Sequence, residues 1–381
     1  MKFSITKAAL FDLVNRAAGV SISRSPMPVL ACVLVDADES GDVSCSSTDL
    51  TMTFSGHAKA EVKEPGSICV SAKDLLERVK NLPTGDVSIR VDNKMALEIK
   101  SASSPRKYKL SGVDPSQFPP LESFGDIKPG FEIDSSVLLD LLNKVYLFIC
   151  PDETRIHMAS LHIVADGTHI RAESINGHQI GRAVEAFKSE PLELLLSIKA
   201  VAQLRRLLAE GDGKVNVSIR GVDAVFEFSW GEFVARIVDA QFPPIERAIP
   251  EKSEYIARVP RAVMADAVKA VACASVEKFG GIALKMSTGT MTIVAESSEH
   301  GEGEDEIPID YDGPELTRLF NAGYVLEALG VLDSEEVEFG FGGQVEPSAW
   351  RSVTEPEKCV VICMPMKLRG VAPAEESKEQ E

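Results

Sequence analysis

A chain of 381 residues is too long for one ordinary hydrophobic core, so we expect two to four domains. The formal net charge of −18 argues against a protein that coats DNA with its whole surface, because such proteins are usually basic. No apolar run reaches the roughly 18 residues of a membrane helix, and no secretory signal follows Met1. We therefore expect a cytoplasmic protein that does not contact a membrane.

The predicted elements form the same series three times along the chain. A short alternating strand followed by a helix is predicted within residues 3–18, 131–146 and 256–271, and a second helix within residues 72–82, 199–209 and 321–332. Thr6, Asp134 or Ser135, and Pro260 stand where helix caps or first-turn residues belong. Alternating runs and turn signals fill the rest of each series, which predicts an α+β unit.

Direct sequence repeats support this threefold organisation. The sequence QFPPL at residues 117–121 returns as QFPPI at residues 241–245, and VSIR at residues 87–90 returns at residues 217–220. Pro, Gly, Lys and Glu cluster between the units. The predicted domains are residues 1–126, 127–252 and 253–368, followed by a disordered acidic tail at residues 369–381.

The seven cysteines are dispersed singly, which predicts reduced thiols that pack as small apolar groups, and we expect no cofactor. Cys359 and Cys363, four residues apart in a strand-like stretch, leave a metal site as the alternative. His157 and His162 lack a matching carboxylate. The turn around Asp38 and Asp42 imitates the start of a calcium loop, but Ser47 stands where that loop needs Glu, so a hairpin is favoured.

Five short motifs, in order on these repeats, resemble one known family. Over residues 1–368 the chain is similar to the beta subunit of bacterial DNA polymerase III, the sliding clamp. The motifs are Arg24 with Met27-Pro28-Val29-Leu30, Ser47-Thr48-Asp49-Leu50, Glu277-Lys278-Phe279, Phe320-Asn321 with Tyr324-Val325-Leu326, and Met364-Pro365-Met366-Lys367-Leu368.

The resemblance implies a fold, a function and partners. It implies a head-to-tail homodimer of six domains, a ring with helices inside and sheets outside. Such a ring encircles double-stranded DNA without reading its sequence and confers processivity on the polymerase, without a catalytic site of its own. Its partners are the DNA polymerase III alpha subunit, the clamp loader, and other polymerases and repair proteins that dock through short peptides.

The resemblance assigns DNA contact to basic residues of the inner helices. These contacts are expected on phosphates, without base readout. For a single helix, Lys and Arg serve more often as a solvated face, and the helix at residues 321–332 carries no basic residue. The predicted DNA-contact residues are Arg24, Lys73, Lys80, Lys199, Arg205 and Arg206.

Two oppositely charged runs suit a head-to-tail contact between subunits. A basic run occupies residues 100–109, late in the first repeat, and an acidic run occupies residues 296–306, in the third. The alternative is two solvated charged loops. The interface residues implied by the family are Lys100, Arg106, Lys107, Tyr108, Cys273, Ala274, Glu299, Glu302 and Glu304.

Family members bind partner peptides in an apolar groove, and the matching positions here are rich in Met, Ile and Pro, which suits promiscuous docking. Each of these side chains, taken alone, would more often belong to an ordinary core. The residues are Met158, Ile175, Gly177, His178, Ile180, Pro243, Arg247, Ile362, Met364, Pro365 and Met366.

Two alternatives to a principal clamp remain. Residues 175–180 read INGHQI where the family has TDGHRL, which leaves room for a divergent paralogue, a spare or drug-tolerant clamp with an altered pocket. An unrelated metal-dependent hydrolase would have to use the scattered His and acidic residues. No GxSxG, phosphate-loop or HExxH motif occurs, so the sequence favours a clamp over an enzyme.

Overall fold

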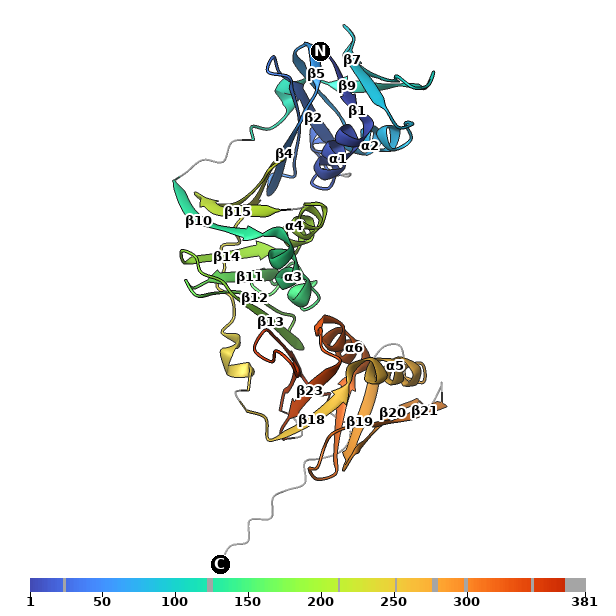
Figure 1. The fold of residues 1–381 in the computed structure, drawn as a ribbon, viewed down its shortest axis with the longest axis vertical. Coiled ribbons are helices and arrows are strands. Elements are labelled where there is room, and N and C mark those ends of the chain that lie inside the picture. Colours follow the sequence, from blue (N-terminus) through green and yellow to red (C-terminus); the bar gives the residue numbers. More distant parts are fainter. Residues whose placement is uncertain are drawn as a thin grey trace, which may run out of the picture. The chain divides into compact units, whose positions relative to one another are not determined.

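The computed structural model describes residues 1–22, 25–121, 126–211, 213–250, 252–275, 280–297, 301–343 and 346–366. The contacts divide the chain into two compact units, and Figure 1 shows the helices and strands along the chain. The first comprises Met1–Asp140, Val164–Thr168 and Phe187–Asp239, and the second comprises Leu141–Ile163, His169–Ala186 and Ala240–Glu381. The division into three domains stays a prediction, and the predicted tail at residues 369–381 lies outside the described residues.

A single 13-stranded sheet runs through the first unit in the order β10-β15-β16-β17-β4-β3-β2-β6-β9-β8-β7-β1-β5. The antiparallel pairing of β17 with β4, from Gly231↔Gly56 to Ala235↔Met52, joins strands of the first and second sequence repeats. The strands are Lys2–Thr6 (β1), Cys32–Ala37 (β2), Asp42–Thr48 (β3), Met52–Lys59 (β4), Glu61–Glu64 (β5), Gly66–Ser71 (β6), Asp86–Val91 (β7), Ala96–Ser101 (β8), Lys107–Val113 (β9), Ile127–Asp134 (β10), Lys214–Arg220 (β15), Asp223–Phe228 (β16) and Gly231–Arg236 (β17); Leu192–Ser197 (β14) also lies in this unit.

Three helices of the first unit begin and bury their faces as the sequence predicts. They are Lys7–Ala18 (α1), Ala72–Lys80 (α2) and Ile198–Glu210 (α4), with short 3-10 turns at Pro28–Ala31 (η1) and Pro115–Gln117 (η2). The side chains of Thr6, Ser71 and Ser197 each accept a hydrogen bond from a first-turn amide, which satisfies a donor that the helix itself leaves unpaired. Helices α1 and α2 pack against each other and against the sheet.

The second unit contains two sheets. In one, an eight-stranded sheet, the strands that include residues of this unit follow the order β11-β12-β13-β25-β24-β23-β18, and the other has the order β21-β20-β19-β22. Helix Ser135–Tyr146 (α3) and strand Ser160–Ala165 (β11) include residues of both units. The other elements are His169–Ile175 (β12), Gln179–Ala186 (β13), Ile245–Ala248 (η3), Tyr255–Pro260 (β18), Arg261–Ala272 (α5), Gly281–Ser287 (β19), Thr290–Ser297 (β20), Gly301–Pro308 (β21), Leu316–Asn321 (β22), Ala322–Val331 (α6), Glu336–Phe341 (β23), Ser348–Ser352 (β24) and Cys359–Cys363 (β25).

Several aromatic side chains pack together in the largely aliphatic core of the second unit. Phe339 stacks on Trp350 with ring centroids 4.2 Å apart, and Phe320 meets Phe339 edge to face at 5.8 Å. All three side chains are at most 1% exposed. Asn321 caps α6 by accepting hydrogen bonds from the amides of Gly323 and Tyr324, so it precedes the helix that was predicted to contain it.

The six predicted helices are confirmed, and the bounds of the second helix of each series differ from the predicted bounds by at most two residues. The Asp38–Asp42 segment is a hairpin turn between β2 and β3, as predicted, with the Asp38 carboxylate accepting the amides of Ser40 and Asp42. The prediction that the cysteines pack as apolar groups is confirmed for six of them and wrong for Cys273, whose side chain is exposed.

Candidate functional site

The basic residues predicted on α2 face solvent. Leu75 and Val79 are buried, and the helical repeat therefore turns Lys73 and Lys80 outward, where both are exposed. Arg78, by contrast, forms an ion pair with Asp74 at 2.9 Å. A hydrogen bond from Ser71, followed by the charge of Arg78, lowers the pKa of Asp74. Lys73 and Lys80 thus present positive charge on the solvent-exposed face of α2.

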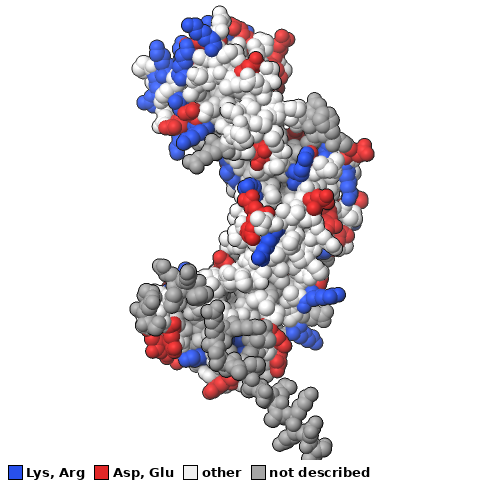
Figure 2. All heavy atoms as spheres, turned by 180° about the vertical axis from the view of Figure 1, so that it is seen from behind, with Lys and Arg blue, Asp and Glu red and all other residues white. Residues whose placement is uncertain are grey.

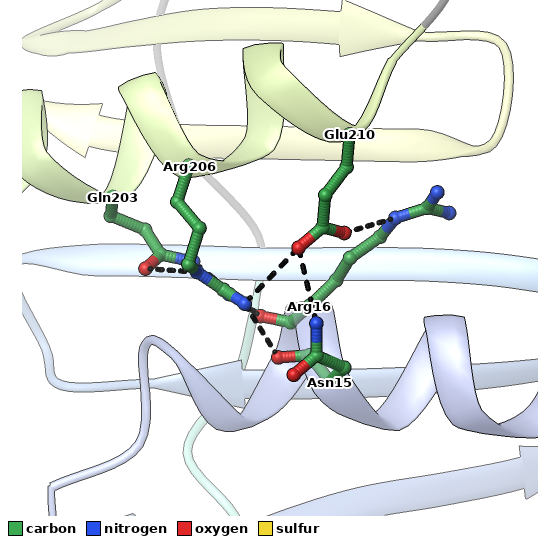
Figure 3. Close-up of polar contacts among 5 residues, drawn as sticks. All are labelled: Asn15, Arg16, Gln203, Arg206 and Glu210. Carbon is green, nitrogen blue, oxygen red and sulfur yellow. Dashed lines mark hydrogen bonds and ion pairs between the residues drawn. The ribbon is translucent and has the colours of Figure 1, made fainter.

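On α4 the predicted cations divide into two kinds. Lys199 is exposed and Arg205 is half-buried, while Leu204 and Leu207 fill the core. Arg206 lies against α1 instead of facing solvent (Figure 3).

The guanidinium of Arg206 closes the C-terminal end of α1. Its Nη1 donates to the carbonyl oxygen of Asn15 at 2.9 Å, and its Nη2 donates to that of Arg16 at 2.7 Å. Its Nε donates to Gln203 Oε1 at 3.2 Å. Burial lowers the pKa of Arg206. These bonds supply donors to two carbonyl groups of the last turn, where the helix itself supplies too few, and place a cation at the negative end of the helix dipole. The predicted phosphate contact of Arg206 therefore competes with a structural role.

A second set of contacts ties the same two helices together. Glu210, at the end of α4, forms an ion pair with Arg16 Nε at 3.2 Å and accepts a hydrogen bond from Asn15 Nδ2 at 3.1 Å (Figure 3). The Arg16 guanidinium lies over the ring of Trp230, 4.0 Å from its centroid. The remaining DNA-contact prediction, Arg24, lies outside the described residues.

The described residues of the two charged runs predicted at the subunit interface lie on or next to two edge strands, β9 and β21. Residues 107–111 of β9 pair with β8 alone among the described strands, since β6 reaches only Gly112 and Val113. Among the strands that the structure describes, β21 is the edge of its sheet and pairs with β20 alone. In Figure 2, Lys and Arg gather on the part of the chain that carries β8 and β9, and Asp and Glu gather on the part that carries β20 and β21. The two edges thus offer unpaired backbone groups with opposite charges beside them.

The individual interface residues differ in exposure. Lys100, Arg106, Lys107, Glu302 and Glu304 are exposed, and Tyr108 is half-buried. Ala274 is only 7% exposed because it packs beneath β21, where a Cβ on Gly303 would lie 3.1 Å from its own. Glu299 lies outside the described residues.

Several of the predicted groove residues, among them Ile175, Ile180 and Ile362, come together on one face of the second unit, whereas Met366 lies against Gly281 of β19. Ile180 pairs with Ile362 across β13 and β25, and both join Ile245 in one apolar cluster. Ile175 and Phe242 pack against this cluster. Of the predicted groove residues, Pro243, Pro365 and Met366 are half-buried and Arg247 is exposed.

The turn between β12 and β13 forms one end of this face. Asn176 Oδ1 accepts the amides of His178 and Gln179, and Gly177 adopts a φ of 93°, which favours glycine. The amide of Met364 donates to the carbonyl oxygen of His178 at 2.9 Å. The His178 ring also stacks on Tyr324, with centroids 5.8 Å apart. Met364 remains 41% exposed, as a side chain free to contact a partner would be.

Sequence reasoning missed a buried charged cluster beside the groove. Glu173, on β12, is 1% exposed and lies among His162, Arg171 and Arg182. The neighbouring His162 ring stacks on Phe242 at 4.7 Å. The alternation of β12 and β13 places these polar residues on the same face as Ile175 and Ile180, but it does not reveal that this face is covered.

Neither a metal site nor a membrane span appears in the part of the chain that the structure describes. No group of three or more His, Cys, Asp or Glu is arranged to hold an ion there. No helix there is long and apolar enough to cross a membrane.

Comparison with known proteins gives consistent matches over nearly the whole chain. Residues 1–122 match the model of the DNA polymerase III beta subunit N-terminal domain, and residues 246–367 match that of its C-terminal domain. The beta sliding clamps of Pseudomonas aeruginosa and Caulobacter vibrioides are each 29% identical over 378 residues, covering 97% of this chain and 100% of the relative. The structure of the Pseudomonas aeruginosa clamp superposes with a TM-score of 0.89 at 27% identity, and one bound to griselimycin with 0.91 at 28%; each covers 97% of this chain and 100% of the other.

Proposed function

This chain belongs to the family of bacterial DNA polymerase III beta subunits, the beta sliding clamps, and we propose on this premise that two copies close head to tail into a ring around duplex DNA. The chain functions as a DNA clamp that gives the polymerase its processivity. The observation that carries the proposal is the match in sequence and fold over nearly the full length of solved clamps. We propose three domains, at residues 1–126, 127–252 and 253–368, and an acidic tail beyond them.

In this proposal DNA is held by topology and touched only weakly. Lys73, Lys80 and Lys199 are exposed on two helices, and their charges would attract phosphates in a salt-dependent way without fixing the clamp to a sequence. Arg205 is the fourth candidate. We assign Arg206 chiefly to the contact between α1 and α4, because its guanidinium already donates to two helix carbonyls.

The proposed dimer contact joins β9 of one subunit to β21 of the other. Both are edge strands over the relevant residues, so their free backbone groups can extend one sheet across the interface. Arg106 and Lys107 on one edge and Glu302 and Glu304 on the other supply opposite charges, which favour the head-to-tail orientation.

Partner peptides are proposed to bind the apolar face formed by Ile175, Ile180, Ile362 and Met364. Apolar side chains with a few polar groups at the edge suit short linear peptides of modest affinity. The partners would be the polymerase III alpha subunit, the clamp loader, and other polymerases and repair proteins in the cytoplasm. The chain would act as an accessory subunit without catalysis of its own.

The test is retention on circular DNA after loading by the clamp loader, repeated after the circle is cut once. Encirclement predicts retention on the circle and loss from the linear form, because the ring slides off free ends. Equal retention on both forms would show ordinary DNA binding and refute the ring. A control reaction must show that the clamp loader loads the clamp known to work with it. If the protein is then absent from both DNA forms, it is not the replicative clamp of the organism that supplied the loader.

A further inference from the structure

A buried carboxylate organises the face beside the proposed peptide groove. Glu173 lies on β12, its side chain 2% exposed, and its Oε2 accepts a hydrogen bond from His162 Nδ1 at 3.1 Å. Its Oε1 forms ion pairs with Arg182 Nε at 2.7 Å and with Arg171 Nε at 3.3 Å. Burial alone would raise the pKa of Glu173, but the hydrogen bond from His162 and the two arginines more than offset it, so the pKa is lowered. Glu173 is therefore ionised at neutral pH.

Two of the residues held by Glu173 also hold the segment that follows β17. His162 stacks on Phe242 with ring planes 25° apart, and Arg182 Nη2 forms an ion pair with Glu246 Oε1 at 3.0 Å. Between these two points Ile245, 2% exposed, enters the apolar cluster. Residues 242–249 are thus attached to the sheet at both sides of Ile245.

The same segment forms one wall of the proposed groove. Phe242, Ala248 and Ile249 pack against the cluster that contains Ile180 and Ile362. If this wall shifted, the spacing between its apolar side chains and those of β13 and β25 would change. Peptide affinity depends on that spacing, because dispersion contacts fall off steeply with distance.

We infer that Glu173 is a positioning residue for partner-peptide binding, acting through His162 and Arg182 on the wall formed by residues 242–249. The inference rests on the proposed function of the groove. Glu173 does not itself reach the groove; it fixes the two side chains to which the wall is attached. Loss of its charge takes the nearest anion away from the half-buried Arg182, so Arg182 turns toward water, its ion pair with Glu246 is lost and the wall moves.

The experiment measures binding of the intact protein to a fluorescein-labelled peptide by fluorescence anisotropy. The probe is the tightest-binding member of an overlapping set that covers the polymerase III alpha subunit of the same organism. The variants are Glu173→Gln, Glu246→Gln and their combination. Glu246 has a 60% exposed side chain, so its substitution leaves the fold intact. Glu185→Gln is the matched control, since Glu185 also lies on this sheet but pairs with Lys358, away from the wall.

The expected result is a dissociation constant raised about tenfold by Glu173→Gln, the factor that corresponds to about 1.4 kcal/mol. Glu246→Gln should weaken binding less, and it should add nothing in the Glu173→Gln background, because both changes release the same wall. Glu185→Gln should leave the affinity unchanged. A general loss of stability would not produce this non-additivity.

Additive effects, or equal effects of Glu185→Gln and Glu173→Gln, would overturn the inference. If Glu173→Gln fails to fold, Glu246→Gln serves as the test, and an unchanged peptide affinity of that variant would also overturn the inference. Met364→Glu separates the two proposals, because Met364 is exposed and lies in the groove itself. If Met364→Glu abolishes binding while Glu173→Gln and Glu246→Gln do not, only the positioning role fails. If Met364→Glu has no effect, the groove assignment fails as well.

Discussion

Removal of the Arg206 side chain should loosen α1 without removing a DNA contact. In Arg206→Ala the carbonyl groups of Asn15 and Arg16 lose two hydrogen bonds from a charged donor. Such bonds contribute about 1.5–3 kcal/mol each, and because the Arg206 side chain is 32% exposed, water replaces part of that. We expect local opening at the end of α1 to become easier by about 2–4 kcal/mol.

Hydrogen exchange is the assay, because it resolves local opening in a multidomain chain where a single unfolding free energy is not defined. The amide of Gly19 donates to the same Arg16 carbonyl that Arg206 contacts, and the amide of Val20 donates to Ala17. A cost of about 2 kcal/mol speeds their exchange by roughly thirtyfold. Lys199 lies at an exposed position of α4, the helix that also carries Arg206. Lys199→Ala should leave the exchange of the Gly19 and Val20 amides unchanged and weaken DNA binding instead.

Gly19→Ala gives an independent check that keeps the charge of Arg206. A Cβ at this position would collide with Arg206 Nη2, so the guanidinium must leave the helix end. This variant should reproduce the faster exchange. If Arg206→Ala instead leaves exchange unchanged and weakens DNA binding as much as Lys199→Ala does, Arg206 is a phosphate contact and the structural assignment is wrong.

Three further predictions concern other charged residues. The double variant Glu302→Lys with Glu304→Lys should raise the dissociation constant of the dimer, measured by sedimentation, about tenfold or more. Adding Arg106→Glu and Lys107→Glu to the same chain should restore the dimer. If the two charged runs are only solvated loops, neither effect will be seen. Lys73→Ala with Lys80→Ala should lower the slope of log affinity against log salt for linear duplex DNA by about 0.9 for each phosphate that the protein no longer neutralises, and an unchanged slope would remove these residues from the DNA site. Hydrogen bonds from Lys109 and from the amides of Ala96 and Lys94 lower the pKa of Asp92 to about 2; this folded value lies below the unfolded one, so the stabilisation is complete above about pH 4 and is lost as the pH falls toward 2. The urea midpoint of Asp92→Asn should therefore lie below that of the wild type at pH 5 and approach it near pH 2, and a constant difference would contradict the assignment.

The helices could be predicted from sequence because each has a local signal. Apolar residues recur at helical spacing, and Thr6, Ser71 and Ser197 stand at the N-termini as caps. The place of Arg206 could not be predicted in this way. Arg205 and Arg206 are adjacent and chemically identical in the sequence, and only the packing of α4 on α1 decides which of them meets the carbonyl groups of residues 15 and 16.

The buried cluster around Glu173 was hidden for a related reason. A charged residue on a strand normally indicates a solvent-facing side. Here residues 242–249 cover that side, and the cover is anchored by Phe242 and Glu246, which lie far from Glu173 in the sequence. Sequence patterns report which strand face a residue occupies, but a covering segment depends on contacts that no local pattern records.

The internal repeats predict a shared scaffold, and the structure confirms it at two turns. In the first unit, Asp49 Oδ1 accepts the amides of Thr51 and Met52, as Asn176 Oδ1 does for the two corresponding amides. The amide of Arg236 donates to the carbonyl oxygen of Thr51 at 2.9 Å, just as that of Met364 donates to His178. Both turns also contain a residue at positive φ.

Of these two equivalent turns, only the second has apolar side chains on the strands beside it. Beside the second turn Ile180 pairs with Ile362, whereas beside the first Thr53 takes the position of Ile180 and pairs with Val234. Where the groove has Met364, the first unit has Arg236 in an ion pair. The leucine at positive φ in the first turn adds strain that Gly177 avoids. The backbone hydrogen bonds of the turn are therefore present in both repeats. A peptide groove also needs aliphatic side chains, and of these two turns only the second has them beside it. Similarity between the repeats thus predicts the turn in both places, but it does not predict a groove in both.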